Sequence, residues 1–149
     1  MRTKNNTTRS IRVVAMDLLS RREHSVYELT RKLKQREFEI DEIDAAIATL
    51  QQDNLQSDSR FIESIVNSKI NAGFGPIKIK YELRQKGISD DLVDDYFSSL
   101  EVDWNLHMAE QRIKKFGEGI PVEYKEKMKQ ARFLQNRGFS LGSVMRLFR

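Results

Sequence analysis

Residues 79–100 have the sequence IKYELRQKGISDDLVDDYFSSL, and this stretch decides the fold because its apolar pattern occurs three times. Leu83 matches Leu33 at a separation of 50 residues and Leu134 at a separation of 51. A fixed period in this range is typical of a tandem array, in which one unit cannot bury its apolar face alone. The other matches are Phe38, Ile43, Ile47 and Leu50 with Ile88, Val93, Phe97 and Leu100, and then Gly87, Ile88, Val93 and Phe97 with Gly138, Phe139, Val144 and Phe148.

The spacing within each repeat predicts three helices. In the first repeat, apolar residues recur at helical intervals from Ile11 to Leu19. Ser25 and Glu28 then form a capping-box pattern, in which each side chain satisfies a backbone amide at the start of a second helix. A third helix is predicted from about residue 41. We therefore predict an all-α protein built from three tandem three-helix repeats of the helix-turn-helix type.

The repeat pattern also divides the chain. We place a flexible basic N-terminus at residues 1–9 and the repeats at residues 10–54, 55–102 and 103–149. The third repeat has eight extra residues around 117–121, which we expect to lengthen its middle helix. No low-complexity linker separates the repeats, so we expect them to touch.

Glycine follows the middle helix in two of the three repeats, at Gly87 and Gly138, where it suits a left-handed cap. Glu37 occupies this position in the first repeat. A left-handed glutamate costs on the order of 1 kcal/mol. We therefore expect the middle helix of the first repeat to end differently.

The composition limits the cellular setting. The chain has 149 residues and no cysteine, which excludes disulfides and thiolate metal sites. Its N-terminus is polar and basic, unlike a secretory signal, and no run approaches the roughly 18 apolar residues that a membrane span needs. We expect a soluble, cytoplasmic protein that does not contact membranes.

Basic residues concentrate in the middle helices, whereas the third helices of the first two repeats are acidic. Helix dipoles favour acids near N-termini and bases near C-termini, so solvated faces are one interpretation. The other is that stacked repeats align the basic helices into a stripe that follows a phosphate backbone or an acidic protein surface. The residues that we assign to this interaction stripe are Arg31, Lys32, Lys34, Lys78, Lys80, Arg84, Lys86, Lys125, Lys129 and Arg132.

The sequence offers no catalytic constellation. His24 and His107 are the only histidines, they lie in different repeats, and neither has an orienting partner in view. No group of residues has metal-ligand spacing, so we predict neither catalytic residues nor a metal or other cofactor. The aromatic residues Trp104 and Tyr124 are expected in the core. Phe74, at the tip of a glycine-rich turn, is either an exposed contact or a core residue.

Four motif blocks, in this order, resemble the RecX regulatory proteins of bacteria. They are Arg21-Arg22-Glu23-His24-Ser25 with Glu28-Leu29; Ser57-Asp58 with Arg60-Phe61; Gly73-x-Gly75-Pro76 with Ile79, Glu82-Leu83 and Lys86-Gly87-Ile88; and Arg132-Phe133-Leu134 with Arg137-Gly138-Phe139-Ser140. The resemblance implies an elongated, curved array without catalytic residues. We expect the protein to be a monomer.

The resemblance also implies partners. Proteins of this family bind the RecA recombinase and its filament on single-stranded DNA, and limit filament extension, ATP hydrolysis, strand exchange and the coprotease activity of the SOS response. They also bind single- and double-stranded DNA. The alternative function is that of a DNA-binding regulator, either sequence-nonspecific or of the helix-turn-helix kind. The third helix of a helix-turn-helix protein enters the DNA groove, where acidic residues would be repelled by the phosphates. The acidic third helices of the first two repeats therefore disfavour a helix-turn-helix DNA-binding protein.

Overall fold

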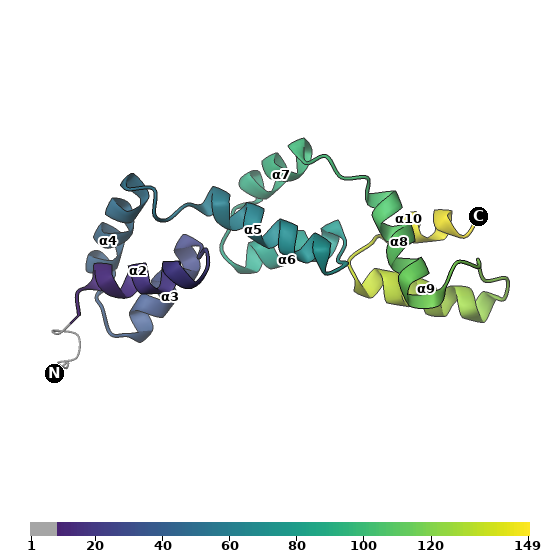
Figure 1. The fold of residues 1–149 in the computed structure, drawn as a ribbon, viewed down its shortest axis with the longest axis horizontal. Coiled ribbons are helices and arrows are strands. Elements are labelled where there is room, and N and C mark those ends of the chain that lie inside the picture. The colour runs from purple at the N-terminus through teal and green to yellow at the C-terminus, as the bar shows by residue number, and fades with distance from the viewer. Residues whose placement is uncertain (1–8) are drawn as a thin grey trace. The chain divides into compact units, whose positions relative to one another are not determined.

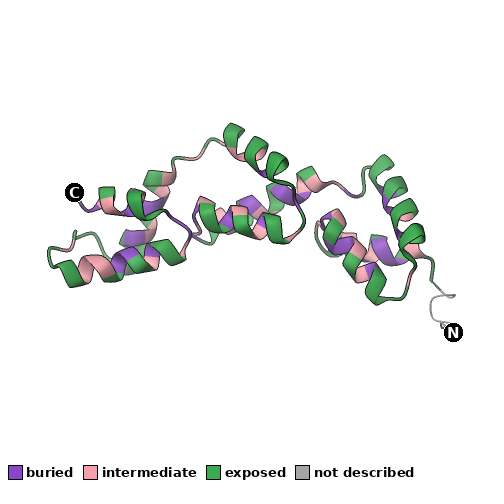
Figure 2. Ribbon diagram, turned by 180° about the vertical axis from the view of Figure 1, so that it is seen from behind, coloured by how far each residue is buried: buried purple, intermediate pink, exposed green. Residues whose placement is uncertain are grey.

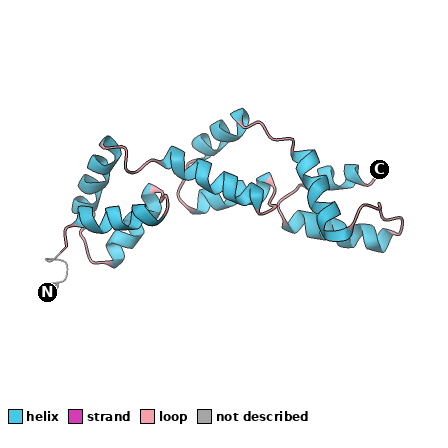
Figure 3. Cartoon of the chain, viewed as in Figure 1, coloured by secondary structure: helices cyan, strands magenta, loops and turns pink. Residues whose placement is uncertain are grey.

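The computed structural model of this chain describes residues 9–149, and these form nine helices joined by short loops (Figures 1 and 3). The prediction of an all-α protein with three tandem three-helix repeats is confirmed. The predicted flexible terminus lies outside the described residues, except for Arg9. The helices are α2 (Ile11–Arg21), α3 (Val26–Gln35) and α4 (Ile40–Gln52); α5 (Asp58–Asn71), α6 (Pro76–Gln85) and α7 (Asp90–Ser99); and α8 (Trp104–Phe116), α9 (Tyr124–Asn136) and α10 (Leu141–Leu147).

Serine side chains define several helix starts. Ser10 and Ser140 each accept a hydrogen bond from the backbone amide three residues on. Ser25 forms the predicted capping box with Glu28 at the start of α3. Ser89 caps α7 in the same way, with 3.3 Å between its Oγ and the Leu92 nitrogen. The capping box explains why the start of α3 could be predicted from the sequence.

Each repeat buries the apolar stripe that the period predicted, and every helix carries both buried and exposed positions (Figure 2). The first core gathers Val14, Ala15, Leu18, Leu29, Leu33, Ile43, Ile47 and Leu50. The core of the third repeat gathers Met108, Ala131, Leu134, Phe139, Val144 and Phe148, with Trp104 packed against it. The expectation that Tyr124 is a core residue is wrong, because its side chain is 75% exposed.

The helices pack as two compact units rather than as three separate repeats. The first unit contains the described residues up to Ser64 together with Arg84–Leu92, and the second contains Ile65–Leu83 and Val93–Arg149. The middle repeat is therefore shared between the two units. The end of its middle helix belongs with the first repeat, and the start of that helix belongs with the third.

A close contact joins the end of α6 to the start of α3 within the first unit. The Ser25 hydroxyl donates to the Lys86 carbonyl oxygen at 2.8 Å. Gly87 has a φ of +83°, and a Cβ at this glycine would lie 2.4 Å from the Cβ of Tyr27. Only glycine meets both requirements, the left-handed backbone and the missing side chain.

The second unit repeats this contact between the end of α9 and the start of α6. The amide of Gly75 donates to the Arg137 carbonyl at 2.6 Å, and that of Ile77 to the Gly138 carbonyl at 3.0 Å. Gly138 has a φ of +104°, and its Cβ would lie 2.6 Å from the Cβ of Lys78. We call these two contacts the glycine joints.

The expectation that the first repeat ends its middle helix differently is wrong. Glu37 has a φ of +71°, so it adopts the left-handed conformation of the two glycines. Its amide donates to the Lys34 carbonyl at 2.9 Å and that of Phe38 to the Leu33 carbonyl at 3.3 Å, the same closing turn as at Gly138. The Glu37 side chain is exposed, so the cost here is conformational and not steric.

The extra residues of the third repeat were predicted to lengthen its middle helix, and only some of them do so. The middle helix α9 has 13 residues against 10 in α3 and α6. The remaining insertion forms the loop of residues 117–123, which has no regular structure.

Substitutions at the glycine joints and at Glu37 can distinguish two contributions to the free energy of unfolding, a steric clash and the strain of a left-handed backbone. We expect Gly87→Ala and Gly138→Ala to lower the free energy of unfolding by at least about 2 kcal/mol, because each adds both strain and a clash. Glu37→Gly should raise it by about 1 kcal/mol, since only strain is relieved there. Urea unfolding monitored by circular dichroism measures these changes. Gly119→Ala is the control, because its Cβ would meet nothing within 4 Å; equal effects at Gly87 and Gly119 would contradict the analysis.

Candidate anion-binding cleft

The first unit contains a polar cleft of about 470 Å³ beside the glycine joint. Its walls come from the segment before α3, from the outer face of α3 and from the end of α6. The lining residues are Arg22, Tyr27, Glu28, Arg31, Lys32, Gln35, Gln85 and Lys86. The cleft therefore depends on the joint, because Gln85, the last residue of α6, and Lys86, which follows it, both line the cleft.

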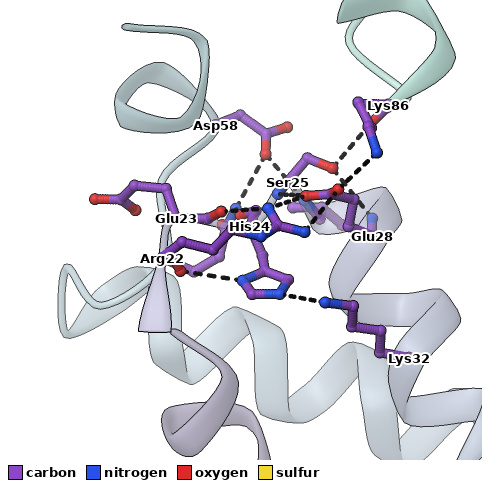
Figure 4. Close-up of polar contacts among 10 residues, drawn as sticks. Arg22, Glu23, His24, Ser25, Glu28, Lys32, Asp58 and Lys86 are labelled. Carbon is purple, nitrogen blue, oxygen red and sulfur yellow. Dashed lines mark hydrogen bonds and ion pairs between the residues drawn. The ribbon is translucent and has the colours of Figure 1, made fainter. Parts of the chain in front are cut away.

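A buried carboxylate, Glu28, organises the cleft (Figure 4). Arg22 binds both of its oxygens, at 3.0 and 3.1 Å, and Lys86 Nζ lies 3.1 Å from Oε2. The Ser25 amide completes the capping box at 3.3 Å. Burial raises the pKa of the Glu28 carboxyl, but the hydrogen bonds from Arg22, Lys86 and Ser25 outweigh burial and lower the pKa to about 2.

A second carboxylate fixes the segment that carries Arg22. Asp58 Oδ1 accepts from the Val26 amide at 2.9 Å and from Gln56 Nε2 at 3.0 Å. Gln56 is buried and also donates to the His24 carbonyl at 3.1 Å. The turn between α2 and α3 is thus held by side chains from the start of α5.

His24 lies in the turn before α3, next to the cleft residues Arg22 and Lys32, and is buried. Lys32 Nζ lies 2.8 Å from His24 Nε2, and His24 Nδ1 lies 3.1 Å from the Arg22 carbonyl oxygen. These contacts are satisfied together when neutral His24 donates from Nδ1 and accepts at Nε2. Burial lowers the pKa of His24, and burial together with the Arg22 charge lowers the pKa of Lys32. The role of His24 is therefore local packing and hydrogen bonding.

The charges of the cleft suit an anion. Four cationic side chains, Arg22, Arg31, Lys32 and Lys86, line it with one carboxylate, Glu28, which leaves a surplus of three positive charges (4 − 1) when all are ionised. Arg31 is exposed, with its guanidinium 5.8 Å from the centre of the Tyr27 ring. An oxyanion held between Arg31 and Lys32 would replace water and favour the charged form of Lys32.

The structure brings together three of the ten residues predicted for the interaction stripe. Arg31, Lys32 and Lys86 line the cleft, whereas Lys34 lies on the same helix outside it. Arg84 is paired with Asp90 at 2.7 Å. Sequence reasoning missed Arg22 and the ion pairs of Glu28, although both residues lie in the first motif block.

The other five predicted residues lie in the second unit. Lys78 Nζ is 5.3 Å from the centre of the Phe74 ring, and Lys80 Nζ is 5.0 Å from that of Phe97. In the described part of the chain, the remaining three make no ion pair and lie exposed on α9. These three are Lys125, Lys129 and Arg132.

Phe74 was predicted to be either an exposed contact or a core residue, and it is half-buried with cationic side chains around its ring. Lys69 and Lys78 lie within 5.4 Å of its ring centre, and Arg137 lies at 5.0 Å. Arg137 also donates to the Ala72 carbonyl at 2.8 Å. The ring thus organises basic side chains beside the second glycine joint.

Residues 9–149 contain no cluster of three or more His, Cys, Asp or Glu placed to hold a metal ion. No helix in the same range has the length and apolar character to cross a bilayer. The fold and the cleft together define a tandem helical-repeat protein with basic surface on its middle helices.

The chain belongs to the RecX family. Family models for the first, second and third three-helix domains of RecX match residues 12–50, 57–96 and 108–148, in that order. The chain is 39% identical to the regulatory protein RecX of Pseudomonas savastanoi pv. phaseolicola over 142 residues, which cover 95% of this chain and 92% of that protein. It is 37% identical to the regulatory protein RecX of Halorhodospira halophila over 135 residues, covering 91% and 84%.

Solved structures agree with this assignment. The crystal structure of RecX from Lactobacillus salivarius superposes with a TM-score of 0.70 at 25% identity, covering 93% of this chain and 94% of that one. A second crystal structure of a regulatory protein RecX also gives a TM-score of 0.70, at 22% identity, and supports the fold alone.

The low pKa of Glu28 predicts a specific loss of stability in acid. A carboxylate whose folded pKa is about 2, against 4.5 normally, contributes stability that is present above pH 4.5 and is lost as the pH falls through 2. We expect the stability advantage of the wild type over Glu28→Gln to shrink by about 3 kcal/mol between about pH 5 and pH 2. Urea unfolding at a series of pH values measures this difference. Glu63→Gln, on an exposed residue of α5 that forms no ion pair in residues 9–149, should show little such change; a constant Glu28→Gln difference would refute the prediction.

Proposed function

We propose that this protein is a non-enzymatic regulator that binds the RecA recombinase and its filament on single-stranded DNA. By limiting filament extension, it inhibits ATP hydrolysis, strand exchange and coprotease activity, and so restrains the SOS response and recombinational repair. It acts in the cytoplasm as a monomer. It binds single- and double-stranded DNA weakly and without sequence preference.

The observation that carries this proposal is the match of all three RecX domain models, in order, along one chain. The relatives are named regulatory proteins, which favours regulation over catalysis. The match spans 95% of this chain and 92% of the relative, so it includes all three domains and not one shared module.

The described surface fits such a role physically. Arg31 and Lys32 leave one side of the cleft open to a phosphate or a carboxylate, because Arg22 and Lys86 already neutralise Glu28. In the proposed arrangement, the repeats at residues 10–54, 55–102 and 103–149 each add weak contacts through the interaction stripe. Contacts made by linked modules reinforce one another, because each later contact forms at high effective concentration.

RecA activity tests the function directly. We expect the rate of ATP hydrolysis by RecA on single-stranded DNA to fall progressively when this protein is added in large molar deficit, because blocked extension affects many subunits per bound molecule. A coupled ATPase assay measures the rate. An unchanged rate, at concentrations where binding to the filament is detected, would remove the proposal.

Charge changes in the cleft test its part in that function. Arg31→Glu combined with Lys32→Gln removes positive charge without touching the Glu28 cluster, and the new amide can still donate to His24. We expect the concentration for half-inhibition of RecA to rise about tenfold, while the helical circular dichroism is unchanged. The matched control is Arg21→Glu with Arg36→Gln, which makes the same charge change at exposed sites outside the cleft. Equal effects of the two pairs would mean that only net charge matters.

DNA binding separates this function from the alternative of a helix-turn-helix regulator. We expect the affinity for single-stranded DNA to fall steeply with salt and to be the same for unrelated sequences, as for phosphate contacts. Selection from a random DNA library, followed by titration at several salt concentrations, measures both properties. A sharp consensus site would favour the alternative.

A further inference from the structure

Two lysines line the anion-binding cleft, and their side-chain nitrogens have different partners. Lys86 Nζ is paired with the buried Glu28 carboxylate at 3.1 Å. Lys32 is half-buried and makes no ion pair within residues 9–149. Its Nζ instead lies 2.8 Å from Nε2 of His24 (Figure 4). Lys32 therefore has an imidazole neighbour where Lys86 has a counter-ion.

His24 presents a basic nitrogen to this amine. His24 Nδ1 lies 3.1 Å from the carbonyl oxygen of Arg22, so the ring proton belongs on Nδ1 and Nε2 is left as the acceptor. The ring is buried, and burial lowers its pKa, which keeps it neutral. A neutral imidazole in hydrogen-bond contact with a nucleophile is the arrangement of a general base.

The surroundings of Lys32 also increase the share of uncharged amine. Burial, followed by the charge of Arg22, lowers the pKa of Lys32. Glu28 opposes this shift, whereas Lys86 and Arg36 add to it. Only the uncharged amine has the lone pair that attacks an electrophile, so at neutral pH Lys32 is a better nucleophile than a fully solvated lysine.

The charges of the cleft favour one class of electrophile, an acyl phosphate. Arg22, Arg31 and Lys86 line the cleft together with Lys32, and Glu28 is the single carboxylate among the lining residues. Negative charge develops on the departing phosphate when an amine attacks an acyl phosphate, so cations beside the amine lower the barrier. A thioester or an anhydride has no phosphate next to its reacting carbonyl for Arg31 to hold.

We propose that Lys32 is a site of acylation by small acyl phosphates, with Arg31 holding the phosphate and the reacting carbonyl directed at Lys32 Nζ. The uncharged amine attacks the carbonyl carbon and forms a C–N bond. The bond from this carbon to the bridging oxygen breaks, and its electron pair leaves with the phosphate. His24 Nε2 accepts the proton that the nitrogen loses and returns it to the released phosphate. The products are an N-acyl-lysine and inorganic phosphate.

One effect opposes the reaction. A bound phosphate favours the charged form of Lys32, which is not nucleophilic. The gain from holding the carbonyl beside the amine must exceed this loss, and reaction rates at individual lysines measure the balance.

Acylation changes the charge of the first unit. It replaces an ammonium group by a neutral amide, so the surplus of positive charges in the cleft falls from three to two (3 − 1). That acylated protein inhibits RecA less rests on the proposed function, whereas the acylation itself needs no RecA. The two ideas therefore fail separately.

Acetyl phosphate is the probe, and peptide mass spectrometry after incubation of the full chain measures the rate at each lysine. We expect Lys32 to react at least about tenfold faster than Lys34, which is exposed on the same helix outside the cleft. Lys32 should also react faster than Lys86, whose ammonium Glu28 holds. Added inorganic phosphate should slow the reaction at Lys32 and leave Lys34 unchanged. Equal rates at Lys32 and at either of the other two lysines would overturn the proposal.

A second reagent and two variants separate phosphate binding from intrinsic reactivity. Acetic anhydride carries no phosphate, so its preference for Lys32 over Lys34 should be smaller. Arg31→Gln removes an exposed cation from the cleft and should lower the acetyl phosphate rate at Lys32 about fivefold, with little change for the anhydride. The control Arg132→Gln makes the same charge change on α9 and should alter neither rate. The same preference for Lys32 with both reagents would mean that the cleft binds no acyl phosphate, and would overturn the proposal.

Discussion

The glycine joint is the contact on which the other features of this structure depend. At Gly87 and at Gly138 a left-handed turn brings the end of one middle helix against the start of the middle helix of the preceding repeat, so closely that a methyl group would overlap Tyr27 or Lys78. Hydrogen bonds to backbone carbonyls hold each contact. Because the middle repeat takes part in both joints, its residues are divided between the two compact units.

The basic cleft follows directly from the first joint. Lys86 reaches Glu28 only because the end of α6 lies against the start of α3, and Glu28 in turn serves both as helix cap and as counter-ion. Two of the four cations are thereby held by a buried carboxylate, while Arg31 and Lys32 remain for an incoming anion. A single glutamate thus links the stability of the first unit to the charge of its surface.

The sequence predicted those features that arise from local chemistry. The period shared by Leu33, Leu83 and Leu134 identified the repeats, and the capping box of Ser25 and Glu28 marked the start of a helix. Helical apolar spacing and a capping box are each carried by a few neighbouring residues, so they can be read from the sequence. The cleft was missed, because two of its lining residues, Gln85 and Lys86, are distant along the chain from the others. The general tendency of aromatic residues to be buried led to the expectation that Tyr124 is in the core, although its side chain at the start of α9 is exposed. The left-handed Glu37 was unexpected, because strain on an exposed turn is compatible with folding when no neighbour packs against it.

That glutamate has a consequence for how such an array can grow. Both glycine joints need a bare backbone at the turn, and Glu37 presents a side chain at the corresponding position of the first repeat. Tyr27 packs against the bare backbone of Gly87, and Lys78 packs against that of Gly138. A fourth three-helix module joined in the same manner at Glu37 would instead meet the glutamate side chain. Glu37 is therefore a steric obstacle to a further joint of this kind at this turn. An engineered longer array that uses this turn would first require Glu37 to be replaced by glycine.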